Sequence, residues 1–443
     1  MTTHDDHTPS SRGVLLGRSN DEWVWSGAER STLVIGPTRS GKTSTVIVPN
    51  VLSASHAVIA TSTKQDVALA TSRARSRAGS CLLFDPSGQT EPTPGVELIG
   101  WSPLRAATTW DGALGTAQAM VAASQRRAVQ SGPVNHWSER AGSMLASLSF
   151  AASQGEKEVA DLVRWVDRHE GHEALEILEA RQGTEHPSTS LLVGLLATDA
   201  REQSGIWSTA SGVLGAYRSL GALSATRAAL LDAHEFVSGA NTLYVCAPGR
   251  QQGLMAPLIV GLLDDLQQAS LQRNESMRPV LFALDELANI APIPELPQLV
   301  SEGGGQGVLT IGCLQDLSQA RARWGPVAEG FMSMFSTTLV LGGIADRSTL
   351  ALLRDLSGHH EPARTTHSVN RDARGRRSEA LSTTPQRRER LSIDDAARTR
   401  PGHALVLDAA NRLGWIEQTV AYRDEPWRGL IERTARDLPA RER

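Results

Sequence analysis

Gly36-Pro37-Thr38-Arg39-Ser40-Gly41-Lys42-Thr43 decides the fold, because these eight residues satisfy the pattern GxxxxGK[ST] between a β-forming run and an apolar helical run. Glycines let such a loop curl so that successive N–H groups point at phosphate oxygens, and the N-terminus of the following helix adds a partial positive charge. We therefore expect residues 36–43 to bind a nucleotide. The alternative, a chance glycine-rich turn, has a frequency of roughly a few per cent in chains of this length.

Two side chains of the loop have roles of their own in this interpretation. Lys42 is expected to reach the β- and γ-phosphates as a catalytic group, and the Thr43 hydroxyl is expected to ligate Mg²⁺. Lysine is rare in this chain, since only Lys42, Lys64 and Lys157 occur among its 44 basic residues. In a chain with so few lysines, a lysine at this motif position indicates a specific role for its side chain. The cofactors expected from the loop are ATP and Mg²⁺.

Strands and helices alternate around the loop. Strands are expected at residues 31–35, 57–61 and 80–84, with helices at 42–51 and 64–77, and a hairpin at 14–16 and 22–25. Pro49 should end or kink the first of these helices. Further β-rich runs occur at residues 241–247, 279–284, 307–313, 336–341 and 402–407. The alternation predicts an α/β fold with a mostly parallel central sheet.

A block rich in Ala, Leu, Glu, Gln and Arg interrupts this alternation. It covers about residues 106–204 and has apolar positions at helical spacing. We expect an inserted all-helical domain there, between two parts of a nucleotide-binding domain at residues 1–105 and 205–443. Residues 361–390 lack periodicity and apolar content, which predicts a mobile loop between two strands of the sheet.

A pair of carboxylates follows another predicted buried strand. Residues 279–284 read Pro-Val-Leu-Phe-Ala-Leu, and Asp285 and Glu286 come directly after them. In a nucleotide site, Asp285 would hold the Mg²⁺ shell and Glu286 would orient and deprotonate the attacking water. The alternative is a helix that begins with Asp-Glu, which the helix dipole favours. The presence of the phosphate-binding loop favours the first interpretation.

Gln315 follows the next predicted strand, at residues 307–313. In motors that place a catalytic glutamate beside the metal-binding aspartate, a polar group at this position senses the γ-phosphate. Gln315 fits that role as a third catalytic candidate. An ordinary glutamine at a strand end is the alternative.

The order of motifs along the chain resembles the coupling ATPases of type IV secretion and conjugation, of the TraG/TraD type, which are relatives of the FtsK and HerA DNA pumps. The resemblance rests on the loop with its Arg39 and on residues 46–50, 61–66, 84–86, 101–104, 284–289, 315–325, 342–346 and 391–406. It covers nearly the whole chain. It implies a RecA-like nucleotide domain with an inserted helical domain, a hexameric ring, and ATP-driven delivery of DNA or protein–DNA complexes into a secretion channel.

The sequence departs from that family in two places. Members usually begin with transmembrane helices, whereas no run of about 18 apolar residues occurs here. We expect a cytoplasmic protein, or one held peripherally at the inner face of the membrane by a separate anchor protein. Residues 303–307 are Gly-Gly-Gly-Gln-Gly where the family often has an arginine that acts across the subunit interface. Arg218, Arg321 and Arg323 are weak substitutes, and a surface-helix role is the alternative for each.

The charge of the chain bears on its partners. Its 44 Lys and Arg against 48 Asp and Glu give a formal net charge of −4, so nucleic acid must bind a local patch or one that assembly creates. Residues 361–390 carry eight arginines against four acids and are locally basic. Six copies in a ring would present a salt-sensitive phosphate surface. A solvated loop without a ligand is the alternative.

The leading hypothesis is therefore an ATP-hydrolysing coupling protein that moves DNA, without sequence preference, towards a type IV secretion channel, with relaxosome and secretion proteins as partners. A second hypothesis keeps the ATPase and makes the cargo a protein effector. In a third, nucleotide binding only gates assembly of a membrane complex.

Overall fold

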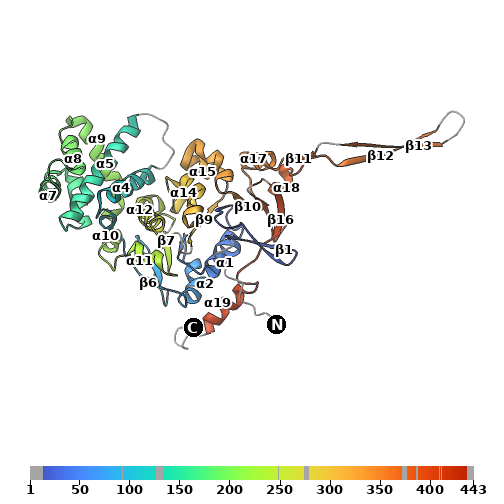
Figure 1. Cartoon of the computed structure of the whole chain (residues 1–443), viewed down its shortest axis with the longest axis horizontal. Coiled ribbons are helices and arrows are strands. Elements are labelled where there is room, and N and C mark those ends of the chain that lie inside the picture. The colour runs from blue at the N-terminus through green and yellow to red at the C-terminus, as the bar shows by residue number, and fades with distance from the viewer. Residues whose placement is uncertain are drawn as a thin grey trace.

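The computed structural model describes residues 13–91, 93–125, 133–247, 249–273, 279–371, 377–385, 388–408, 410 and 412–436. Figure 1 shows a central sheet, a block of helices on one side of it, and a narrow two-stranded ribbon that projects from the other side. None of the helices in these ranges combines the length and apolarity needed to cross a bilayer.

Twelve strands within the described ranges form one sheet, in the order β2-β1-β16-β15-β10-β3-β9-β8-β4-β7-β5-β6. They are β1 Leu15–Ser19, β2 Glu22–Trp25, β3 Thr32–Ile35, β4 Val58–Ser62, β5 Cys81–Phe84, β6 Glu97–Leu98, β7 Thr242–Cys246, β8 Val280–Leu284, β9 Val308–Leu314, β10 Thr337–Leu341, β15 His403–Leu407 and β16 Leu413–Glu417. Every pairing from β10 to β6 is parallel, and β15, β16, β1 and β2 add an antiparallel edge. The prediction of a mostly parallel α/β sheet is confirmed.

The strands that carry the predicted motifs are neighbours at the centre of this sheet. β9 lies between β3 and β8 and is parallel to both, with Ile35 opposite Leu314 and Leu284 opposite Gly312. All three strands are fully buried. Their carboxyl ends therefore meet at one edge, where ligands bind in open parallel sheets.

Pro49 shapes the helix after the loop differently from the prediction. A π-helical segment, Thr43–Ile47, leads into α1, Val48–Ser53, so Pro49 stands in the first turn of α1 and does not end the helix. In a π-helix each N–H bonds to the carbonyl five residues earlier, and the Val48 N–H bonds to the Thr43 carbonyl in this way. The next acceptor in this pattern is the Ser44 carbonyl, but Pro49 has no N–H to donate to it. The backbone N–H of Ala421 bonds to the Ser44 carbonyl instead, at 3.0 Å.

Helices fill the interval between β5–β6 and β7, and they form the block at the left of Figure 1. The main ones are α4 Trp110–Ser124, α5 Pro133–Gln154, α6 Val159–Arg168, α7 His172–Gln182, α8 Pro187–Leu196, α9 Ala200–Val213, α10 Leu220–Ala225 and α11 Ala233–Ser238. The boundary expected at residue 204 falls inside α9, and helices continue to Ser238. Periodicity alone could not find this boundary because both sides of it are helical.

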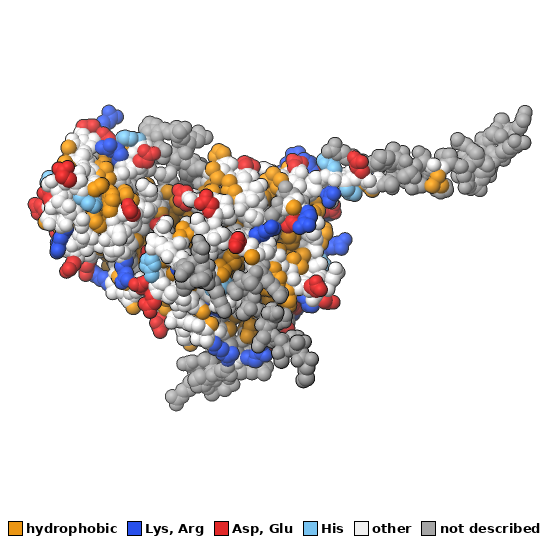
Figure 2. Space-filling view, viewed as in Figure 1, with side chains coloured by type: hydrophobic (Ala, Val, Ile, Leu, Met, Phe, Trp, Pro, Cys, Tyr) orange, Lys and Arg blue, Asp and Glu red, His pale blue; other side chains and the backbone are white. Residues whose placement is uncertain are grey.

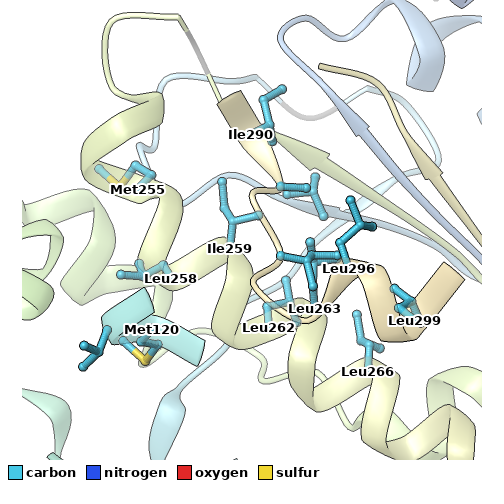
Figure 3. Packing of buried hydrophobic residues seen from close by; sticks show 14 of the residues in the cluster. Met120, Met255, Leu258, Ile259, Leu262, Leu263, Leu266, Ile290, Leu296 and Leu299 are labelled. Carbon is cyan, nitrogen blue, oxygen red and sulfur yellow. The ribbon is translucent and has the colours of Figure 1, made fainter. Parts of the chain in front are cut away.

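Helix α12, Gln252–Leu271, joins the helical block to the sheet. It packs against α4 on one side and against α13, Leu287–Ile290, on the other. Figure 3 shows Met120 of α4 beside Leu258 of α12, with Ile290 beyond the opposite face and Leu296 of α14, Leu296–Glu302, beside Leu263. α13 begins directly after the Asp285-Glu286 pair, so this core also holds the predicted site.

The segment at 361–390 is not a loop. Strands β12, Ala363–Arg371, and β13, Arg377–Pro385, pair antiparallel along their whole length and form the ribbon at the right of Figure 1. Shorter strands at its base, β11 His359–His360 and β14 Arg388–Glu389, pair with one another. We call residues 361–390 the arm. The ladder pairs its backbone groups, and its sequence has few apolar residues, which explains why the hydrophobic pattern gave no sign of strands. The prediction that it lies between two sheet strands holds, since β10 and β15 flank it in the chain.

The core around α12 gives a direct test of stability. Leu262 on this helix is fully buried, whereas Leu254 is 44% exposed on the same helix. Leu262→Ala should lower the free energy of unfolding by about 2–5 kcal/mol, because it leaves a cavity as well as losing buried surface. Leu254→Ala, measured by the same denaturant titration, should cost less than about 1 kcal/mol. Equal losses for the two variants would contradict the packing described here.

Candidate active site

Lys42 lies inside the curl of the loop. Its side chain is buried at 7% exposure, and Nζ donates hydrogen bonds to the carbonyl oxygens of Gly36, at 2.5 Å, and Pro37, at 3.0 Å. These carbonyls hold the ammonium group at the centre of the loop, which begins where β3 ends. The Gly36 N–H in turn bonds to the Leu314 carbonyl of β9, at 3.1 Å.

The loop backbone needs its glycines. A Cβ on Gly36 would lie 2.7 Å from Ser40 Oγ and 2.8 Å from Leu341 Cβ, which leaves no room for a side chain. Gly41 has a φ of 97°, and Arg39, an exposed residue, has a φ of 66°. Positive φ is uncommon for a residue with a side chain and marks a backbone shaped by function. Thr38 lies with Arg39 on the exposed rim of the loop.

Thr43 and Asp285 meet across the sheet edge. The Thr43 hydroxyl donates to Asp285 Oδ2 at 2.6 Å, although the two residues are 242 positions apart in the chain. The Thr61 hydroxyl of β4 donates to the Asp285 backbone carbonyl at 2.9 Å and fixes the turn after β8. The two residues predicted to hold a metal are thus in direct contact.

Several neighbouring groups act on the pKa of the Asp285 carboxyl, and they act in opposite directions. Burial raises its pKa above the usual range, while the hydrogen bond from Thr43 and the charge of Lys42 lower it, and the neighbouring charges of Glu286 and Asp66 raise it further. Burial is the largest of these effects. A cation at the site would favour the ionised form that burial opposes.

Glu286 follows in a left-handed conformation, with φ 53° and ψ 46°, and precedes the first turn of α13. A non-glycine residue held there costs of order 1–3 kcal/mol, so packing must impose the turn. Its Oε2 accepts a hydrogen bond from Asn289 Nδ2 at 3.1 Å. The structure thus places Glu286 at the same edge as Lys42, Thr43 and Asp285, with its carboxylate held by a side-chain amide.

Gln315 lies at this edge too, directly after β9 and between the strands of the loop and the two acids. It is partly buried, and its backbone N–H donates to Gln319 Oε1 at 2.9 Å. Its place fits a residue that contacts a terminal phosphate. The sensing role of its side chain stays a prediction.

The residues present fit a nucleotide with Mg²⁺. Among the described residues, Ser40 Oγ, within the loop, is buried without a hydrogen-bond partner. A buried hydroxyl without a partner costs free energy unless a ligand or water satisfies it. Hydroxyl and carboxylate oxygens, as in Thr43 and Asp285, are the ligands that Mg²⁺ prefers.

The three arginines considered for a role across subunits all have partners within the chain. Arg321 donates to Asp346 at 2.9 Å, and Arg218 bonds to Asp167 and Ser211. Arg323 donates to the backbone carbonyls of Ala123 and Gln125, each at 2.5 Å, and burial lowers its pKa to about 10. Their geometry favours roles within one subunit.

Sequence reasoning missed the segment that covers the back of the site. Gln418 Nε2 bonds to Thr45 Oγ1 at 3.3 Å, next to the bond between Ala421 and Ser44 described above. Trp427, at the start of α19, Trp427–Arg436, bonds to Ser53 Oγ at 2.8 Å. Asn289 was likewise missed as a partner of Glu286, although the two residues stand three positions apart, which is the spacing at which side chains meet on a helix.

Comparisons with known proteins agree with this geometry. The family model described as "Type IV secretory system Conjugative DNA transfer" matches residues 5–407. A structure of the bacterial conjugative coupling protein TrwBΔN70, in its unbound form, superposes with a TM-score of 0.70 at 17% identity, covering 94% of this chain and 91% of that one. TrwB with the GTP analogue GDPNP gives 0.68 at 17% identity, covering 93% and 89%. TrwB with ADP and Mg²⁺ gives 0.66 at 17% identity, covering 89% and 85%. None of the curated proteins compared with this chain matches it.

The buried Asp285 carboxyl predicts a pH-dependent gain in stability on neutralisation. Because its folded pKa lies above its unfolded value, the stability that it contributes in acid is lost as the pH rises through the folded pKa. Asp285→Asn should therefore stabilise the nucleotide-free protein at neutral pH and not below about pH 4. Thermal unfolding from pH 4 to 8 measures the difference.

Glu173 provides a control of opposite sign. A hydrogen bond from Lys157, with others from Trp165 and Arg164, lowers its pKa to about 2. The ionised Glu173 carboxylate therefore stabilises the folded protein above its unfolded pKa, and this stabilisation is lost as the pH falls towards 2. Glu173→Gln should destabilise the protein at neutral pH, and the difference from wild type should shrink in acid. If Asp285→Asn destabilised the protein with the same pH trend as Glu173→Gln, the account of Asp285 would be wrong.

Proposed function

This chain belongs to the type IV secretory system conjugative DNA transfer family, and from that membership we propose that it is an ATP-hydrolysing coupling protein that moves DNA to a type IV secretion channel. The contact between Thr43 and Asp285 is the observation that carries the ATPase part of this proposal. It joins the phosphate-binding loop to the first of two adjacent acids at the carboxyl edge of a parallel sheet. The fold it shares with TrwB is that of a RecA-like P-loop protein.

Each residue of the site has one task in this proposal. Residues 36–43 hold the phosphates with backbone N–H groups, and Lys42 supplies the fixed positive charge. Thr43 and Asp285 would hold Mg²⁺, which when bound would neutralise phosphate charge. Glu286 orients the attacking water and accepts its proton, and Gln315 contacts the terminal phosphate.

The assembly and domains are proposed on the same basis. We infer a homo-hexamer, with the helices between residues 106 and 238 as an insertion into a nucleotide-binding domain formed by residues 1–105 and 239–443. This revises the boundary of 204 to agree with the end of α11. Relaxosome and secretion proteins would be its partners, and a separate protein would anchor it at the membrane.

DNA is the cargo that the charge distribution favours. On the face of the body seen in Figure 2, acidic and basic side chains are interspersed, whereas the arm has eight arginines against four acids in its sequence. A protein effector is the alternative cargo, and a nucleotide gate for assembly is the alternative to a motor. Measurements of DNA-dependent ATPase activity separate these possibilities.

Glu286→Gln tests the motor. Wild-type protein should hydrolyse ATP, and single- or double-stranded DNA should increase the rate. The variant should bind ATP with an affinity near that of wild type and lose at least about a hundredfold in turnover, because the amide cannot accept a proton. Phosphate release and nucleotide binding are measured in parallel, together with oligomeric mass with and without ATP.

Lys42→Ala is the matched control, since it should lose ATP binding as well as turnover. Wild-type turnover in Glu286→Gln would remove Glu286 as the base. Turnover that DNA leaves unchanged would favour a protein cargo. Normal DNA transfer in cells carrying Glu286→Gln would favour the assembly gate.

Removal of the arm tests its contact with DNA. Because β11 and β14 pair at its base, residues 363–385 can be replaced by a short Gly-Ser turn without opening the sheet. The affinity for DNA should fall, and the plot of log K against log salt concentration should become flatter. A variant with lysine in place of the arm arginines should keep the wild-type slope. Equal slopes for the deletion and wild type would show that the arm does not contact DNA.

A further inference from the structure

A second cavity opens beside the catalytic edge. Its volume is about 480 Å³, and its lining comes from the turn after β7, the start of α12, helix α13, helix α15, Leu317–Trp324, and the last turn of α4. It therefore lies over the carboxyl ends of the strands that carry the nucleotide site, where loops of an open parallel sheet contact ligands.

The charge of the cavity selects an anion. Among the described residues that line it are two arginines, Arg250 and Arg323, and no acid. Arg323 donates to the carbonyls that end α4, whereas Arg250 is exposed and makes no ion pair with any described residue. No side chain caps the start of α12, so its partial positive charge adds to theirs. A cavity of this size can hold a phosphodiester with its flanking sugars.

A larger cavity, of about 1130 Å³, lies between α3, Pro103–Ala106, with α4 on one side and α11 with α12 on the other, and it has a different character. It is lined by five acids as well as by three basic residues. Burial raises the pKa of one of these acids, Asp264, to about 6. Its mixed charge gives no preference for an anion.

Two amides connect the smaller cavity to the catalytic residues. Asn289 lines the cavity and donates through Nδ2 to Glu286 Oε2 at 3.1 Å. Gln319 lines it as well, and its Oε1 accepts the backbone N–H of Gln315 at 2.9 Å. Both Glu286 and Gln315 are therefore one hydrogen bond away from a residue that lines the cavity.

We propose that this cavity, with Arg250, Asn289 and Gln319, binds a phosphate group of the nucleic-acid cargo and that its occupant draws the Asn289 amide away from Glu286. The inference rests on the proposed function and deepens it. Without a phosphate, the amide engages the carboxylate oxygen of Glu286 that faces it and holds the side chain in that position. With a phosphate, Asn289 turns to the anion and Glu286 is free for the attacking water. Asn289 is a positioning residue in this scheme, and it makes hydrolysis depend on cargo.

Asn289→Ala tests the positioning role. Its ATPase rate without DNA should rise about tenfold, the scale of one hydrogen bond to a carboxylate, and the further increase by DNA should nearly vanish. Loss of a purely structural cap on α13 would lower the rate or the melting temperature and would not raise the rate. Asn289 is exposed, so the variant should fold.

Arg250→Ala tests the phosphate contact. The concentration of a single-stranded oligonucleotide that gives half-maximal stimulation should rise about tenfold, and the slope of log K against log salt concentration should fall by about 0.7, the share of one phosphate contact. Binding is followed by the anisotropy of a labelled oligonucleotide. Arg168→Ala, on the helical block, removes an exposed arginine with only a long contact to Glu170 at 4.0 Å, and it should match wild type in both measurements.

The outcomes separate this inference from the proposed function. If DNA raises the ATPase rate of wild type, and Asn289→Ala and Arg250→Ala both respond to DNA as wild type does, the cavity is not a phosphate site. The proposed coupling function is unaffected by that result. If DNA neither binds nor stimulates the wild type, the coupling function fails. The proposed anion site is then supported only if inorganic phosphate, at constant ionic strength, raises the ATPase rate of wild type and not that of Arg250→Ala. That result would identify free phosphate as the ligand. If inorganic phosphate does not raise the rate in this way, the proposed phosphate site is wrong as well.

Discussion

The contact between the Thr43 hydroxyl and the Asp285 carboxylate is the interaction on which the rest of this structure depends. It closes a separation of 242 residues with a hydrogen bond of 2.6 Å. β3 and β8 are not neighbours, so the contact requires β9 to lie between them with all three strands parallel and in register. In the chain, the helical block lies between Thr43 and Asp285. The backbone must therefore come back to the sheet after this block with the register of the strands unchanged. Packing of α12 against both parts achieves this.

The same contact places unfavourable groups at the centre of the protein. Asp285 is a buried carboxyl with a raised pKa, Glu286 has a left-handed backbone, and Ser40 Oγ has no hydrogen-bond partner among the described residues. Each reduces the stability of the folded chain, and they occur within one loop and one strand end. Such a concentration is expected where a ligand supplies the missing charge and hydrogen bonds. The buried strands and the core around α12 provide the stability that tolerates it.

Single residues also couple distant parts of the chain. Pro49 cannot give an N–H to the Ser44 carbonyl, and that carbonyl binds Ala421, so the C-terminal segment is held against the helix that follows the phosphate loop. The contact of Asn289 with Glu286 is local, three residues along the chain, but α13, which carries it, packs on α12. The loop helix and the Glu286 side chain are thus both attached to elements outside the loop. The arm, in contrast, pairs only with itself along β12 and β13, which leaves it free of the sheet's register.

The sequence alone determined the phosphate loop, the two acids, the parallel α/β class and the family, because these depend on local patterns: glycines at fixed spacing, apolar runs that end in carboxylates, and their order along the chain. It placed most central strands within one or two residues for the same reason. It did not find the arm's strands, whose sequence lacks an alternation of apolar and polar residues, nor the end of the helical block inside a continuous helical pattern. The tertiary structure alone decided that Gln418 and Ala421 cover the loop helix and that Arg250 faces a cavity whose described lining has no acid. These contacts join side chains by the packing of whole elements, and no local pattern of residues records which elements will pack together.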